Sequence, residues 1–235
     1  MTAIEHLEEL RRRILACLAV IVAATGVGLW LSGRLIEWLK RPAGDLLPKL
    51  AFFAPTEALV AHVQVAVLFG LTLSTPVLLY QIWAFVAPGL KPPERRAGLM
   101  AVAAATILFL LGGAFAYIFL LPAFLRFLLT IGAPSMEPVI SINRYVSFVI
   151  GVMMGCAVMF ELPVVALLLV RFGWLTPETM QRQRGIAIIV IMVIAAIVTP
   201  TTDAVSLLVM AVPLLVLYEV SIILAKMMTR RSARS

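Results

Sequence analysis

Two acidic residues of this very apolar chain stand where a carboxylate could bind a cationic ligand. Glu9 belongs to the charged segment HLEELRRRI at 6–14, and Glu94 follows the rigid pair Pro92-Pro93 in a second charged segment. A carboxylate can accept two parallel N–H bonds from a guanidinium, so both could bind an arginine-bearing ligand. The alternatives are local: Glu9 can pair with Arg13 four residues on, and Glu94 can favour the start of a helix.

A third acid, Glu161, is the single charged residue between Tyr145 and Val170. A charged side chain at the centre of a bilayer costs at least about 2.5 to 3.5 kcal/mol, and such residues are usually functional. Pro163 removes a backbone hydrogen bond nearby and should bend the helix. We predict an intramembrane polar site at Glu161 and Pro163. The alternative is a structural carboxyl that bonds to the carbonyl freed by the proline.

Residues typical of catalytic or metal centres are scarce. The chain has two histidines, and its two cysteines, Cys17 and Cys156, lie inside apolar stretches. It contains no G-x-S-x-G, no H-E-x-x-H and no Walker loop. We expect no enzymatic activity, no metal and no cofactor.

The elements that position these acids are membrane-spanning helices. Of the 235 residues 63% are hydrophobic and 13% are charged, and the mean hydropathy is +1.07, which excludes a water-soluble domain. The sequence predicts an all-α polytopic fold in one domain, residues 1–235. Six transmembrane helices are expected at about 14–32, 64–87, 98–121, 145–170, 186–199 and 204–222.

The last two spans are expected to be short. The strongly apolar part of the fifth, Ile186 to Val198, makes about 20 Å of helix against about 30 Å of hydrocarbon. A re-entrant hairpin is the alternative to two true spans. Because mismatch favours helix association, we predict that these spans dock a small single-span partner. The predicted docking residues are Asp203, Ser206, Ala211 and Glu219, although Asp203 could simply cap a helix, Glu219 could reach the membrane surface and the small residues could pack within the chain.

The distribution of basic residues predicts the orientation. With six spans both termini share a side, and that side holds thirteen of the 19 Lys and Arg residues. Basic residues favour the cytoplasmic side, so both termini are expected to be cytoplasmic. The net charge of +7 is then explained by the lipid bilayer as partner, and we expect no nucleic acid.

Several segments together resemble the TatC family, the multispanning receptor subunit of the twin-arginine protein translocase. They cover nearly the whole chain: HLEELRRRI at 6–14, FFAPTEA at 52–58, TPVLLYQIWAFVAPGLKPPERR at 75–96, GGAFAYIFLLP at 112–122, FELPV at 160–164, TPTTD at 199–203 and PLLVLYE at 213–219. The resemblance implies that Glu9 and Glu94, with Arg95 and Arg96 beside them, bind the arginine pair of a signal peptide.

The resemblance also implies the cellular role. It implies a protein of the bacterial cytoplasmic (inner) membrane that works with the small subunits TatA and TatB, forms a homo-oligomer in the complex and exports folded proteins with the proton gradient. Two other functions remain open from the residues alone: a proton-coupled secondary transporter that uses Glu161, and a purely structural membrane subunit.

Overall fold

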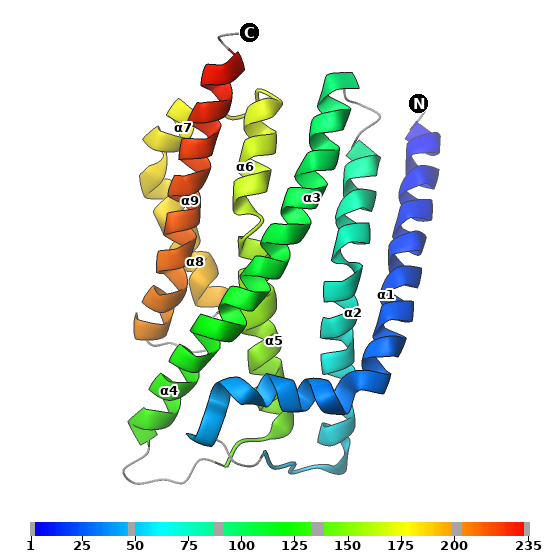
Figure 1. The fold of residues 1–235 in the computed structure, drawn as a ribbon, viewed down its shortest axis with the longest axis vertical. Helices are drawn as coiled ribbons and strands as arrows, with labels where there is room; N and C mark the ends of the chain where they lie inside the picture. Colours follow the sequence, from blue (N-terminus) through cyan, green and yellow to red (C-terminus); the bar gives the residue numbers. More distant parts are fainter. Residues whose placement is uncertain (1–2, 47–49, 87–91, 133–138, 199–203, 233–235) are drawn as a thin grey trace.

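The computed structural model describes the chain except residues 1–2, 47–49, 87–91, 133–138, 199–203 and 233–235. The described residues are almost entirely helical, with one isolated parallel bridge between Ala51 and Ser141. The helices stand side by side, and the two termini lie at the same end of the molecule (Figure 1). The elements in chain order are α1 (Ala3–Lys40), η1 (Arg41–Leu46), α2 (Pro55–Val86), α3 (Pro92–Phe115), the π-helical turn η3 (Ala116–Leu120), α4 (Leu121–Gly132), α5 (Ile142–Met159), α6 (Leu162–Arg171), α7 (Pro177–Arg182), α8 (Arg184–Val198) and α9 (Ala204–Ser232).

The helix lengths confirm an all-α membrane protein. Among the described residues, five helices are long and apolar enough to cross a membrane, and a shorter apolar helix covers Arg184–Ile197. Of the two spans expected to be short, one needs correction. The 15 residues of α8 make about 22 Å, but α9 has 29 residues. It extends beyond the apolar run because no Gly or Pro follows Pro213 to end it.

Helix α1 bends sharply, and its last part lies across the end of the molecule opposite the termini (Figure 1). The pair Ser32-Gly33 is typical of such a bend, and the Ser32 hydroxyl donates to the Leu29 carbonyl at 2.7 Å. We call residues 33–40 the crossing arm. The Tyr145 hydroxyl donates to the Leu39 carbonyl at 2.8 Å, and the Tyr117 hydroxyl donates to the Trp38 carbonyl at 2.8 Å. Two tyrosines thus hold the arm against α5 and η3.

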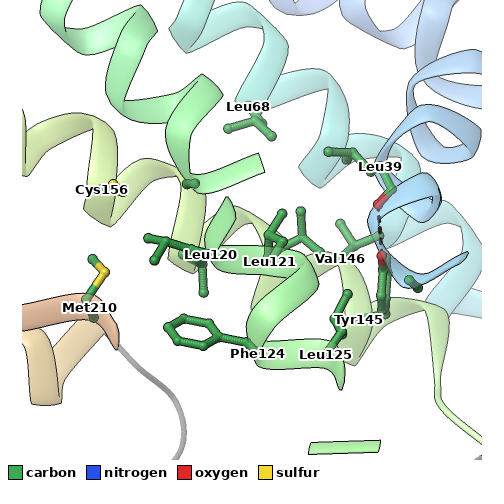
Figure 2. Close-up of a cluster of buried hydrophobic side chains, with 14 of the residues drawn as sticks. Leu39, Leu68, Leu120, Leu121, Phe124, Leu125, Tyr145, Val146, Cys156 and Met210 are labelled. Atoms are coloured by element: carbon green, nitrogen blue, oxygen red, sulfur yellow. Dashed lines mark hydrogen bonds between the residues drawn. The ribbon is translucent and has the colours of Figure 1, made fainter. Parts of the chain in front are cut away.

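The main hydrophobic core lies beneath the crossing arm. Figure 2 shows Leu39 of the arm near Tyr145 and Val146 of α5, with Leu121 at the start of α4 beside them. Each of these side chains is at most 3% exposed. The arm therefore covers apolar surface that helices much later in the chain provide.

Small residues bring α1 and α2 into close contact. A Cβ atom built on Gly28 would stand 2.6 Å from the Ala66 carbonyl oxygen, and one on Gly70 would stand 2.9 Å from the Thr25 amide nitrogen. Small residues allow this close approach of helix backbones. The alignment continues to the terminal end of the molecule, where the rings of His6 and Phe85 stack with centroids 4.3 Å apart. It fixes which residues of α1 and α2 meet there.

Candidate binding site

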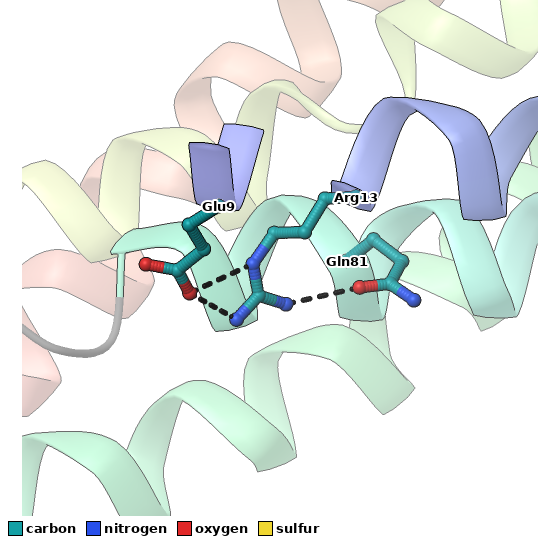
Figure 3. Close-up of polar contacts among 3 residues, drawn as sticks. All are labelled: Glu9, Arg13 and Gln81. Atoms are coloured by element: carbon teal, nitrogen blue, oxygen red, sulfur yellow. Dashed lines mark hydrogen bonds and ion pairs between the residues drawn. The ribbon is translucent and has the colours of Figure 1, made fainter. Parts of the chain in front are cut away.

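The first predicted acceptor, Glu9, lies between α1 and α2 at the end of the molecule that carries the termini. Figure 3 shows Glu9 and Arg13 on α1 beside Gln81 of α2. Arg13 donates to Glu9 Oε1 through Nε at 3.0 Å and through Nη2 at 2.5 Å. Its Nη1 donates to Gln81 Oε1 at 2.9 Å. The guanidinium is therefore held by both helices.

The other oxygen of the same carboxylate is in a different position. Glu9 Oε2 is buried and has no hydrogen-bond partner among the described residues. The whole Glu9 side chain is 19% exposed and that of Arg13 is 23% exposed. The local pairing foreseen for Glu9 is thus present, but it uses only one of the two carboxylate oxygens.

The second predicted acceptor lies at the start of α3. Glu94, Arg95 and Arg96 follow Pro92, where the helix begins, and proline is well suited to a first helical turn. The side chains of these three residues lie outside the described part of the structure. The approach of Glu94 to Glu9 stays a prediction.

Glu161 lies at a break between two helices, as Pro163 led us to expect. Helix α5 ends at Met159 and α6 begins at Leu162, with Phe160 and Glu161 between them. Glu161 Oε1 is buried and has no hydrogen-bond partner among the described residues. The bond to a freed carbonyl, the structural alternative, is not seen for this oxygen.

A cavity of about 370 Å³ opens beside Glu161. It lies between α2, α3 and α6, and its other lining residues are apolar or aromatic, among them Trp83, Val164 and Trp174. Trp83 also packs on Gly98, so a side chain at position 98 would collide with the indole. The cavity joins a buried carboxyl to an apolar wall, which suits an apolar helix with one polar group.

The predicted docking residues lie in different surroundings. Ser206 and Ala211 are each 1% exposed, and Ala211 belongs to the main core, so both pack inside the chain. Glu219 is about half exposed and accepts from Arg184 Nη2 of α8 at 2.7 Å. Asp203 lies outside the described residues. The outward surface of α9 is made by other side chains, among them Leu208, Val212 and Val216.

Two polar residues with structural contacts were not identified from the sequence, and one of them, Gln81, belongs to the site. Gln81 is a polar residue in an apolar helix, and that contrast was the available signal for it. At the opposite end, Glu57 Oε2 accepts from the Phe53 amide at 3.0 Å and from the Ser141 hydroxyl at 2.9 Å. Glu57 therefore joins the start of α2 to the start of α5.

The described residues contain no group of three His, Cys, Asp or Glu side chains that could hold a metal ion.

The comparisons with known proteins agree with one another. A family model described as "Sec-independent protein translocase protein (TatC)" matches residues 5–213. The chain is 39% identical over 226 residues to a Sec-independent protein translocase protein TatC of Carboxydothermus hydrogenoformans, with 96% of this chain and 93% of the relative covered. It is 35% identical over 235 residues to the TatC protein of Aquifex aeolicus, with 98% and 97% covered. A crystal structure described as the twin arginine translocase receptor TatC in DDM has a TM-score of 0.84 at 35% identity, with 94% and 99% covered.

Proposed function

Because the chain belongs to the TatC family of Sec-independent protein translocase proteins, we propose that it is the receptor that binds twin-arginine signal peptides. The observation that carries this proposal is the Glu9 carboxylate, which lies at a helix end and has one oxygen without a partner among the described residues. Glu94 supplies the second carboxylate, with Arg95 and Arg96 beside it. Each acid accepts one arginine of the pair through charge-assisted hydrogen bonds.

The receptor site faces the cytoplasm. Both termini lie at the same end of the molecule as the start of α1, which carries Glu9 (Figure 1). The segments that the sequence assigns to this side hold thirteen of the 19 Lys and Arg residues. The excess of Lys and Arg there supports six spans with both termini inside, in the cytoplasmic membrane of a bacterium. Cargo therefore meets the receptor before it crosses.

The cavity beside Glu161 receives side chains of an apolar helix, either the apolar part of the signal peptide or a partner helix. Its volume of about 370 Å³ has room for a few side chains, and its wall is apolar and aromatic apart from Glu161. Glu161 offers a polar contact within the apolar wall, at the break between α5 and α6. Glu161 and Pro163 thus form the intramembrane part of the site.

Small single-span subunits, TatA and TatB, dock on α8 and α9. The short α8 leaves a mismatch with the bilayer of about 8 Å, the difference between about 22 Å and about 30 Å, which a second helix can relieve. The proposed contacts of this face are the half-exposed Glu219 and Asp203, which directly precedes α9 in the sequence, while the buried Ser206 and Ala211 hold α9 to its own chain. With these partners the chain forms a homo-oligomeric translocase that uses the proton gradient.

One binding experiment tests the receptor function. The purified full-length protein in detergent is titrated with a labelled twin-arginine signal peptide and with the same peptide carrying Lys-Lys. We expect the first to bind and the second to bind at least about tenfold more weakly, because lysine cannot form the two-pronged guanidinium contact. Equal affinity for both peptides would contradict the proposal and favour a structural subunit or a transporter.

A further inference from the structure

Neither oxygen of the Glu9 carboxylate is open to a ligand in this structure. One oxygen, Oε1, already accepts two N–H bonds from Arg13. The other, Oε2, has almost no contact with solvent and no partner among the described residues. A ligand guanidinium therefore meets no freely accessible oxygen on Glu9, and something has to move before it can bind.

Arg13 is itself held from a second direction. Its Nη1 donates to Gln81 Oε1 at 2.9 Å, and Gln81 lies on α2. Two edges of the planar guanidinium are thus occupied, one by a carboxylate on its own helix and one by an amide on the neighbouring helix (Figure 3). A binding site for an arginine ligand needs acceptors of this kind, and here the chain's own Arg13 occupies them.

We infer that Arg13 is an internal substitute for the ligand's arginine, which must displace it from Glu9 Oε1. The inference rests on the proposed function, since it assumes that Glu9 accepts a ligand guanidinium. The exchange replaces one guanidinium by another, so the net gain in binding is small for arginine and negative for a group that forms fewer N–H bonds. Lysine is such a group because its ammonium is a compact charge without the planar fork. Arg13 thus determines specificity by competing with the ligand.

Two substitutions release the competitor in different ways. Arg13→Gln removes the guanidinium. Gln81→Leu keeps the guanidinium but removes its hydrogen bond to α2. Arg12→Gln is the matched control, because it removes the same charge from the neighbouring residue, whose side chain is exposed. The Kd of the labelled twin-arginine peptide and of its Lys-Lys form is measured for each full-length variant at a fixed salt concentration.

We expect Arg13→Gln to bind the twin-arginine peptide on the order of twofold to fivefold more tightly than Arg12→Gln, the scale of an exposed ion pair. Gln81→Leu shifts the Kd in the same direction by a smaller factor. The ratio of the Lys-Lys to the Arg-Arg Kd falls in Arg13→Gln. Thermal unfolding and size-exclusion profiles establish that each variant is folded. If Arg13→Gln does not fold, Gln81→Leu still tests the inference.

Weaker or unchanged binding in Arg13→Gln relative to Arg12→Gln overturns the inference, and so does weaker or unchanged binding in Gln81→Leu if Arg13→Gln is unfolded. Glu9→Gln separates this failure from failure of the proposed function. Loss of binding in both Glu9→Gln and Arg13→Gln would keep Glu9 as the acceptor and make Arg13 a residue that orients it. Normal binding in Glu9→Gln would remove the receptor site itself.

Discussion

Gly70 of α2 lies so close to Thr25 of α1 that a Cβ atom on the glycine would stand 2.9 Å from the Thr25 amide nitrogen. The Thr25 hydroxyl oxygen is nearer still, and behind it the amide nitrogen is backbone, which cannot turn aside as a flexible side chain could. Since the same pair of helices carries Glu9, Arg13 and Gln81, this contact sets the register of the candidate site.

The first prediction concerns this contact. Gly70→Ala should destabilise the protein by about 1 to 3 kcal/mol, the usual cost of extra volume at a tight contact. Gly26→Ala is the matched control because nothing lies within 4 Å of its Cβ position, and alanine there should leave stability unchanged or raise it slightly. Thermal unfolding in detergent compares the two. Equal unfolding temperatures would show that α1 and α2 can separate at Gly70 without cost.

The second prediction concerns the acceptor carboxylate. Glu9→Gln should weaken binding of the twin-arginine peptide by at least about tenfold, because a hydrogen bond to a charged group contributes about 1.5 to 3 kcal/mol. Glu8→Gln makes the same chemical change at an exposed neighbour and should have little effect. Titration of both full-length variants measures this. A similar loss in both would point to general charge attraction instead of a site.

Glu161 provides the third prediction. Glu161→Leu should abolish most export of a twin-arginine reporter in cells that lack another receptor, while the protein still inserts, because an apolar residue costs less in the bilayer than a carboxyl. Glu161→Gln should retain export, since an amide keeps the polar contact in the cavity. Loss of export in both would favour a carboxyl that carries protons, as in the transporter alternative. Normal export in Glu161→Leu would leave the residue without a role in transport.

The fourth prediction concerns the outward face of α9. Leu208, Val212 and Val216 are four residues apart and 52 to 58% exposed, whereas Met210 and Leu214 are 1% exposed. Single cysteines at the first three positions should crosslink to a co-expressed small subunit, with Met210→Cys and Leu214→Cys as buried controls. The experiment starts from a chain in which Cys17 and Cys156 are replaced. Single cysteines at exposed positions of α1, α2 and α3 complete the set, and crosslinks obtained only from those helices would place the partner elsewhere.

The features that could be predicted from the sequence are local ones. Apolar runs and their charged ends predict the membrane helices, since length and composition decide whether a helix can cross a bilayer. The helix break at Glu161 follows from Pro163, two residues away, because proline acts on its own turn. The pairing of Glu9 with Arg13 follows from helical spacing.

The features that escaped prediction depend on residues far apart in the chain. Gln81 meets Arg13 across 68 residues, and the burial of Ser206 and Ala211 depends on how α9 packs. Neither spacing nor composition indicates which side of α9 packs against the rest of the chain, because apolar residues lie on all sides of this helix. The length of α9 was underestimated for a local reason: the apolar run ends before the helix does.

The crossing arm has a consequence for the order in which a nascent chain can complete its structure. Its two tyrosine hydrogen bonds span 79 and 106 residues. The arm leaves the ribosome early, yet η3 and α5, which supply Tyr117 and Tyr145, are synthesised much later. The contact between α1 and α2 can form while the rest is being made, but the arm reaches its final place only after α5 has been inserted. A chain arrested before Tyr145 is made therefore lacks this anchor on the arm.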